Sequence, residues 1–267
     1  MNTLLRQVSA SVAYIREHCS NPADVALILG SGLGAFADSL PFPQVVPTSA
    51  IPHYPRSGVE GHRGRLVFAS VEGKNLLAFQ GRVHFYETSS LEATLFPIHV
   101  AHSLGVRTLI VTNAAGGINR GFSPGDLMLI TDQINLTGEN ALSGPNGASV
   151  HHSYYSESLI HLACNAAESA KIPLRSGVYA GLKGPTYETA AEVEMVYRLG
   201  GDAAGMSTVL EVGLAASLGM QVLGISCITN HATGISATRL SHAEVTEVGN
   251  RVKTTFAALL TEIIRRV

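Results

Sequence analysis

The chain of 267 residues contains no tryptophan, and charged residues make up only 14% of it. Its formal net charge of −2 gives no sign of the basic surface with which proteins bind nucleic acid, so we expect no such partner. The three cysteines, Cys19, Cys164 and Cys227, are far apart and odd in number. They predict neither a disulfide framework nor a zinc cluster, and a reduced cytoplasmic compartment fits them best.

Long hydrophobic runs are missing as well. No apolar stretch approaches the roughly 18 residues that are needed to span a bilayer. Residues 1–20 have the pattern of an amphipathic helix without the apolar block of a signal peptide, and we expect no membrane partner. Hydrophobic residues still amount to 46%, which is enough for a substantial core, and the low charge leaves room for sister subunits on the surface.

Several catalytic motifs are absent. The sequence has no HExxH or CxxC and no clustered carboxylates, so metal and glycosidase mechanisms lack their parts. No Gly-Lys-Ser/Thr loop occurs, and the first lysine is Lys74. The dinucleotide fingerprint also fails, because the glycines are spaced G-x-G-x-G and no Asp or Glu lies between Ser39 and Val59. The prolines in that segment favour an irregular loop over a second parallel strand.

Short apolar runs alternate with helical patterns along the chain. Strands are expected at 25–29, 66–71, 75–81, 108–117, 127–134, 176–184, 202–207 and 221–230. Helices are expected at about 2–18, 89–104, 153–170, 188–199, 208–219 and 241–266. Residues 71–75 form a hairpin turn between two strands, so the sheet is mixed. We predict an α/β fold, a single domain over residues 1–267 with a mixed central β-sheet flanked by helices.

The ends of the predicted strands are unusually polar or rich in glycine. These ends read GSGLG, QGRVHFYE, TNAAGG, GPTYE, GMS and TNHATG. In open α/β sheets, ligands bind at the carboxyl ends of strands. The sequence therefore predicts a binding site that several strand ends build together.

The first of these ends is a glycine turn around Ser31. Glycine lets backbone N–H groups approach an anion closely, which indicates phosphate. A tight turn without any ligand is the alternative.

In QGRVHFYE, the residues Arg82, His84 and Tyr86 are spaced by two and share one face of an extended chain. A guanidinium beside a histidine suits a dianion, although a polar strand edge facing solvent would have the same pattern. His62, in the loop GHRG, is by itself more typical of a surface histidine.

Two further stretches offer groups for a heterocycle. Glu188 in GPTYETAAE lies near the start of a predicted helix, where it could bind a ligand or merely complement the helix dipole. Asn230 in TNHATG ends an apolar strand and can offer a donor and an acceptor, or it can close an Asx turn. Ser241 and Glu244 have the spacing of a capping box.

Taken in order, these stretches resemble the trimeric, low-molecular-mass family of purine nucleoside phosphorylases over nearly the whole chain. The resemblance rests on GSGLG (30–34), GHRGRLVF (61–68), QGRVHFYE (80–87), VTNAAGG (111–117), GDLMLITDQINL (125–136), GPTYETAAE (184–192), GMSTV (205–209), ITN (228–230) and SHAEV (241–245). Each motif alone is weak, but all of them in this order are specific. The resemblance implies the nucleoside phosphorylase fold, and it implies that the glycine turn serves inorganic phosphate.

The resemblance also assigns the site residues. Phosphate would be bound by Ser31, Arg82, His84, the backbone around Ala114, and Ser207, with His62 covering its side. Ribose would meet Tyr86, Met206 and His242. The purine would meet Ala114, Ala115, Gly116, Tyr187, Glu188 and Asn230.

The implied reaction is the reversible phosphorolysis of inosine and guanosine by a homotrimer, without a metal or organic cofactor. The catalytic groups would be Glu188, Asn230 and His84.

Two alternatives are a methylthioadenosine phosphorylase and a nucleoside-binding regulator. The first typically has Asp at the position of Asn230 and lacks a match to His242. The second would be expected to lose Arg82, Glu188 or Asn230, all of which are present.

The chain departs from the family at Tyr187, often Phe, and at Leu210, often Pro. The aromatic residue that a neighbouring subunit lends to the sugar pocket has three candidates here: His152, Tyr154 and Tyr155.

Overall fold

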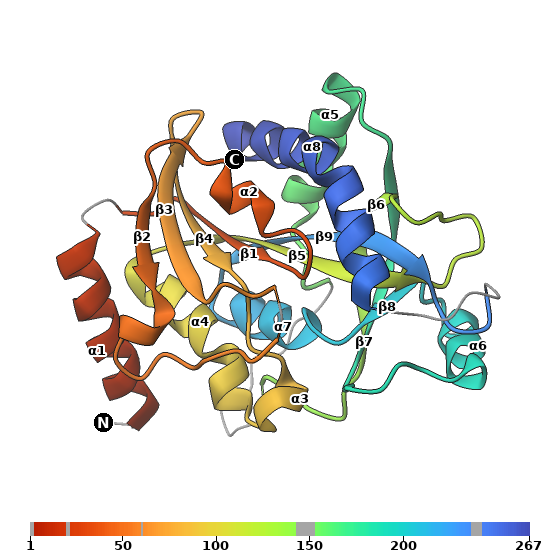
Figure 1. The fold of residues 1–267 in the computed structure, drawn as a ribbon, viewed down its shortest axis with the longest axis horizontal. Helices are drawn as coiled ribbons and strands as arrows, with labels where there is room; N and C mark the ends of the chain where they lie inside the picture. Colours follow the sequence, from red (N-terminus) through yellow and green to blue (C-terminus); the bar gives the residue numbers. More distant parts are fainter. Residues whose placement is uncertain (1–2, 20–21, 60, 143–152, 236–241) are drawn as a thin grey trace.

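A mixed sheet of nine strands runs through the described part of the molecule (Figure 1). The computed structural model describes residues 3–19, 22–59, 61–142, 153–235 and 242–267, and of residues 242–245 the backbone alone. The strands are β1 (Val25–Leu29), β2 (Gln44–Pro47), β3 (Arg65–Val71), β4 (Lys74–Gln80), β5 (Thr108–Gly117), β6 (Leu127–Leu136), β7 (Leu174–Leu182), β8 (Ala203–Gly205) and β9 (Gln221–His231). The predicted α/β fold with a mixed central sheet is confirmed.

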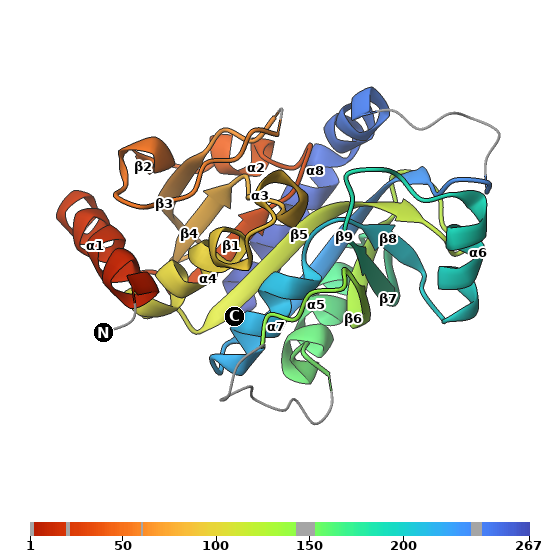
Figure 2. The same cartoon turned by 90° about the horizontal axis from the view of Figure 1, so that it is seen from below.

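Helices lie on both faces of the sheet (Figure 1). They are α1 (Thr3–His18), α2 (Ala35–Asp38), the short 3₁₀ helix η1 (Thr48–Ala50), α3 (Phe85–Thr88), α4 (Leu91–Leu104), α5 (Glu157–Ser169), α6 (Ala190–Arg198), α7 (Val209–Ser217) and α8 (His242–Arg266). Helices α1, α4 and α7 cover one face, and α2, α5 and α8 cover the other. Helices α1 and α6 lie at opposite ends of the molecule (Figure 2).

The sequence of β1 shows why a strand between two helix layers is apolar throughout. Ala26 and Ile28 point into the core beneath α1 and α4. Val25, Leu27 and Leu29 point into the core beneath α2 and α8. A strand that is buried on both faces loses the alternation of polar and apolar residues, and each large side chain contributes about 1.5–3 kcal/mol by its burial.

Strand β5 is the centre of the sheet. Along one edge it pairs with β9 over its whole length, from Thr108 to Gly117. On the other edge β1 pairs with residues 108–111 and β8 pairs with residues 116–117. Within the described chain, residues 112–115 therefore have no strand on that edge. The sheet thus opens between the end of β1 and β8, and strands β5, β8, β7, β6 and β9 close into a ring beyond the opening.

Most predicted elements are present within a few residues of their predicted bounds. The hairpin is confirmed, because β3 and β4 are antiparallel and Val71 pairs with Lys74 across a turn with positive φ at Glu72 and Gly73. The proline-rich segment after Ser39 is not wholly irregular, because it contains β2. This strand lies at the edge of the sheet, where a proline costs no ladder hydrogen bond.

Candidate active site

A pocket opens where β5 lacks a neighbour. It lies at the carboxyl ends of strands, as the polar strand ends predicted. Its lining consists of Gly30, Ser31, Val59, Arg82, His84, Tyr86, Asn113, Ala114, Ala115, Gly116, Tyr187, Glu188, Ala204, Gly205, Met206, Ser207, Thr229, Asn230 and Ala232.

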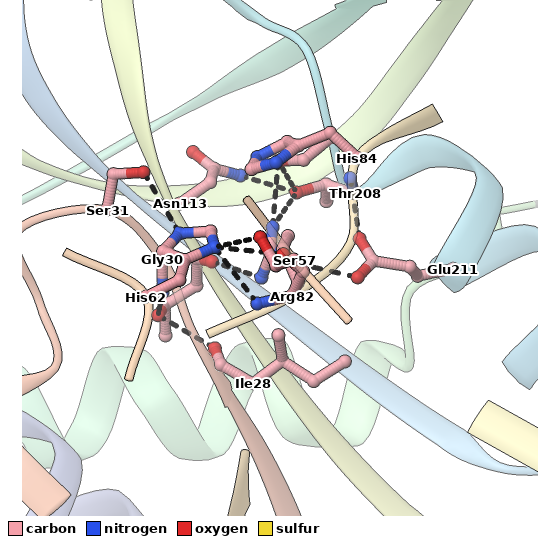
Figure 3. Close-up of polar contacts among 12 residues, drawn as sticks. Ile28, Gly30, Ser31, Ser57, His62, Arg82, His84, Asn113, Thr208 and Glu211 are labelled. Atoms are coloured by element: carbon pink, nitrogen blue, oxygen red, sulfur yellow. Dashed lines mark hydrogen bonds and ion pairs between the residues drawn. The ribbon is translucent and has the colours of Figure 1, made fainter. Parts of the chain in front are cut away.

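The glycine turn after β1 owes its glycines to backbone geometry. A Cβ on Gly30 would lie 2.6 Å from the Cα of Asn113, so only glycine lets β1 end this close to β5. Gly32 has a φ of 74°, which favours glycine. Between these two glycines Ser31 lies at the edge of the pocket, and its hydroxyl is 3.2 Å from Nε2 of His62 (Figure 3).

The segment after β4 is extended only as far as His84, and α3 begins at Phe85. The prediction of an extended chain through Tyr86 is therefore wrong. The cause is a capping box, in which the carboxylate of Glu87 accepts the backbone N–H of His84 at 2.7 Å. Arg82, His84 and Tyr86 nevertheless all line the pocket, because the ring of Tyr86 stacks on that of His84 with 5.0 Å between the centroids.

Arg82 is buried beneath the opening in the sheet, with 5% of its surface exposed. Its Nη2 donates to the carbonyl of Thr112 at 2.6 Å, and its Nη1 donates to the hydroxyl of Ser207 at 2.7 Å. The guanidinium is thus fixed between the middle of β5 and the turn before α7. In this position it can present a fixed positive group to an anion at the unpaired edge of β5.

His62 lies one layer behind the pocket and is not part of its lining. Its Nδ1 is 2.8 Å from the carbonyl oxygen of Arg82. A carbonyl only accepts, so Nδ1 carries the ring proton and Nε2 accepts the hydroxyl of Ser31. Burial, followed by the charge of neighbouring His84, lowers the pKa of His62 to about 4, so the ring is neutral at pH 7. His62 therefore acts on the pocket through Ser31.

Glu87 holds His84 and the loop before His62 in place through its carboxylate. Its carboxylate accepts the backbone N–H of Gly58 at 2.7 Å and lies 3.2 Å from Nδ1 of His84. Burial alone would raise the pKa of Glu87. Hydrogen bonds from the side chain and backbone of His84 and from Gly58 outweigh burial and lower this pKa to about 2. Glu87 is therefore ionised at pH 7, and it ties the loop before His62 to His84.

The far end of the pocket carries the two groups predicted to bind a heterocycle. Nδ2 of Asn230 donates to the carbonyl of His231 at 3.0 Å, and Oδ1 accepts the hydroxyl of Thr229 at 2.9 Å. One N–H of the Asn230 amide is left for a ligand. Burial raises the pKa of Glu188 above its ordinary value.

Glu188 does not cap helix α6. The cap is made by Thr189 and Glu192, whose side chains and backbone N–H groups bond to each other. The helix start is therefore capped without Glu188, whose carboxylate accepts a backbone N–H of its own residue. Glu188 instead lines the pocket beside Tyr187.

The pocket brings together most of the predicted site residues. Those that line it are Ser31, Arg82, His84, Tyr86, Ala114, Ala115, Gly116, Tyr187, Glu188, Met206, Ser207 and Asn230. His62 lies behind Ser31. The side chain of His242, the Ser241–Glu244 capping box and His152 lie outside the described residues.

Tyr155 can be removed from the aromatic candidates for a neighbouring pocket. Only 4% of its surface is exposed, and its hydroxyl donates to Gln133 of the same chain. Tyr154 is half-buried and remains a candidate.

Sequence reasoning missed Asn113 in the pocket lining and the carboxylates that act behind the pocket, Glu87 and Glu211. One signal was available for Glu211, because Thr208-Val-Leu-Glu211 has the Ser/Thr-x-x-Glu spacing of a capping box, and the structure forms that box. Among the described residues, no group of three or more His, Cys, Asp or Glu side chains could hold a metal ion. Within the same ranges, the helices are too short or too polar to cross a membrane.

Comparison with known proteins identifies relatives that match this chain over almost its whole length. The sequence profile of the phosphorylase superfamily matches residues 24–265. Purine nucleoside phosphorylase 1 of Bacillus subtilis (strain 168) is 47% identical over 264 residues, which cover 97% of each chain.

Two solved structures of Schistosoma mansoni purine nucleoside phosphorylase have a similar fold. The complex with adenosine has a TM-score of 0.92 and 34% identity, covering 98% of each chain. The complex with inosine has a TM-score of 0.92 and 33% identity, covering 98% of this chain and 97% of that one.

Proposed function

The chain belongs to the phosphorylase superfamily, among its purine nucleoside phosphorylases, and we propose that its pocket catalyses the reversible phosphorolysis of 6-oxopurine nucleosides. The products are the free purine and α-(deoxy)ribose 1-phosphate. The observation that carries this proposal is buried Arg82, fixed between Thr112 and Ser207 at the unpaired edge of β5. A positive group in that place, with serine hydroxyls on either side, suits inorganic phosphate.

Phosphate would lie between the turn after β1 and the turn before α7. The hydroxyl of Ser31 can rotate from His62 to the anion, Arg82 and Ser207 would donate from below, and His84 and the backbone at Ala114 would complete the site. Ribose would lie against Tyr86 and Met206, and we place His242 at its 5′-hydroxyl.

The chemistry follows from where charge develops. Breaking the glycosidic bond leaves positive charge on the sugar and negative charge on the departing base. Phosphate held beside the sugar stabilises the first charge electrostatically and then captures the cation, so the reaction gains from fixed orientation. Asn230 would stabilise the base at ring nitrogen 7 with its free amide N–H, and Glu188 would accept the N–H of ring nitrogen 1.

Base recognition follows from the same two groups. The purine ring would lie against Ala114, Ala115, Gly116 and Tyr187. The relatives from Schistosoma mansoni have been solved with adenosine and with inosine, so occupancy of such a pocket does not distinguish the bases. We therefore propose that the preference for 6-oxopurines is expressed in kcat/KM.

Release of hypoxanthine from inosine should require added inorganic phosphate and should survive EDTA, because we propose that no metal or organic cofactor takes part. The measurement compares initial rates in phosphate-free buffer, with phosphate, and with phosphate plus EDTA. Equal rates with and without phosphate would identify a hydrolase and contradict the proposal. Loss of the phosphate-dependent rate in EDTA would contradict the claim that no metal is needed.

We propose that the functional unit is a homotrimer. Support comes from the low charge of 14% and from apolar side chains on α6 that are exposed in the single chain, namely Met195 and Tyr197. Sedimentation equilibrium should give three times the mass of 28.1 kDa. A fully active monomer at every concentration would contradict this state.

We also propose a cytoplasmic location. All three cysteines are free, and Cys164 is exposed, which suits a reducing compartment. Recovery of the protein outside the cytoplasm after cell fractionation would contradict it.

A further inference from the structure

A carboxylate lies directly beneath the proposed phosphate site. Glu211 is the third residue of α7, and only 3% of its surface is exposed. Its Oε2 accepts the backbone N–H of Thr208 at 2.7 Å, and its Oε1 lies 3.5 Å from Nε of Arg82 (Figure 3). A buried acidic group beside the site of an anion needs an explanation, because its charge opposes the charge of the ligand.

The partners of Arg82 show that Glu211 belongs to a connected network. The guanidinium has five N–H groups. Nε faces Glu211, Nη2 donates to Thr112, and Nη1 contacts Ser207 and Thr208 at 2.7 and 3.3 Å. Three of the five N–H groups are thus assigned to hydrogen bonds within the protein, and Nε faces the carboxylate of Glu211 as an ion pair without a hydrogen bond. Arg82 is held in one orientation, and it leaves little of its fork for the anion.

The same network dictates where the hydroxyl of Ser207 points. Oγ1 of Thr208 faces two donors, Nη1 of Arg82 and Nδ2 of Asn113, which fill its two lone pairs. The Thr208 hydroxyl then donates to Oγ of Ser207, 3.1 Å away. Oγ of Ser207 accepts from Thr208 and Arg82, so its own proton is free to point into the pocket that Ser207 lines. Ser207 thus becomes a preset donor.

The backbone at Thr208 also needs support. Its φ of 77° and ψ of −58° are costly for a β-branched residue, and such conformations persist only where the surroundings impose them. The hydrogen bond from the Thr208 N–H to Glu211 is one such restraint.

We propose that Glu211 is a positioning residue for phosphate, whose carboxylate fixes Arg82 and Thr208 and through them turns the Ser207 hydroxyl toward the anion. Glu211 offsets part of the charge of Arg82, so directed hydrogen bonds from Arg82 and Ser207 hold phosphate together with the attraction to the guanidinium. The phosphate keeps its own negative charge to stabilise the sugar cation. This inference rests on the proposed phosphate site.

The test is Glu211→Gln, which keeps the size of the side chain. An amide whose oxygen keeps the hydrogen bond from Thr208 places its NH₂ group, without negative charge, beside the Nε–H of Arg82, where two donors face each other. We expect the KM for phosphate to rise at least tenfold while the KM for inosine stays within twofold. Calorimetric titration with inorganic phosphate alone should show the same weakening, and Glu211→Asp should recover part of it.

Glu192→Gln is the matched control, because Glu192 makes the same capping box with Thr189 at the start of α6 and does not contact Arg82. It should leave the KM for phosphate unchanged. Thr208→Val removes the hydroxyl and leaves the Arg82–Glu211 ion pair in place. It should raise the KM for phosphate several-fold, and it serves as the test if Glu211→Gln does not fold.

A wild-type enzyme that needs no phosphate would overturn the proposed function itself. A phosphate-dependent wild type would leave the role of Glu211 to be decided by the variants. If Glu211→Gln, or Thr208→Val where the former does not fold, lowers only thermal stability and leaves the KM for phosphate within twofold, the positioning role is wrong.

Discussion

Replacing Arg82 with alanine should lower kcat/KM for phosphate by about a thousandfold while hypoxanthine still binds. Arg82 is buried and fixed toward the unpaired edge of β5, so it can donate to phosphate without reorganising. The remaining N–H of Arg82 gives phosphate one charge-assisted hydrogen bond at roughly 1.5–3 kcal/mol, and the lost hydrogen bond to Ser207, which presets that donor, adds roughly 1 kcal/mol, so the two together account for a loss of this size. Steady-state kinetics with phosphate as the varied substrate and calorimetry with hypoxanthine would measure both parts.

The alanine variant has a second effect, which must be separated from the first. It leaves Glu211 as an unpaired buried carboxylate, at a cost to folding of about 3–5 kcal/mol. Adding Glu211→Ala should recover stability without recovering turnover. Arg82→Lys keeps the charge but cannot reach Ser207, Thr112 and Glu211 together, so it should also be impaired.

The matched control for Arg82→Ala is Arg63→Ala. The guanidinium of Arg63 is exposed and pairs with Asp38 at 3.2 Å, and we expect wild-type kinetics from this variant. A wild-type KM for phosphate in Arg82→Ala would show that phosphate binds elsewhere.

The location of this site could be predicted from the sequence, because strand ends carry a local signal. An apolar run that stops at GSGLG or TNHATG marks both a strand and the point where its chain leaves the core. The carboxyl ends of β1, β5 and β9 then meet at one opening, since these strands are parallel neighbours. The open edge of β5 itself could not be predicted. It exists because β1 pairs only with residues 108–111 of β5, whereas β8 pairs only with residues 116–117 at the far end of β5.

The roles of the two carboxylates behind the pocket could not be predicted from the sequence, for a physical reason. Glu87 and Glu211 do not line the pocket and act through hydrogen bonds to residues that do. Capping-box spacing marks where such a carboxylate stands on its own helix, but it does not show that the carboxylate faces His84 or Arg82. Helix α3 was missed for a different reason, because a single capped turn has too few residues to show a helical period.

The choice of base depends on two polar groups at the other end of the pocket. A 6-oxopurine carries a hydrogen on ring nitrogen 1, which the carboxylate of Glu188 can accept, whereas adenine presents a lone pair there. The free N–H of Asn230 can reach ring nitrogen 7 and a 6-oxo group, whereas a 6-amino group would face it as another donor. Each mismatched buried polar group costs roughly 1–3 kcal/mol, so discrimination against adenosine should be on the order of 100-fold or more.

Asn230→Asp should reverse this preference in part, lowering kcat/KM for inosine and raising it for adenosine. One carboxylate oxygen can still accept the hydroxyl of Thr229, but the other replaces the amide nitrogen that lies 3.0 Å from the carbonyl of His231, where two acceptors repel. The variant therefore loses the donor for a 6-oxo group and gains an acceptor for a 6-amino group. The ratio of kcat/KM for the two nucleosides, measured on one preparation, cancels any loss of folded protein. An unchanged ratio, or a wild-type enzyme that cleaves adenosine as well as inosine, would show that Glu188 and Asn230 do not select the base.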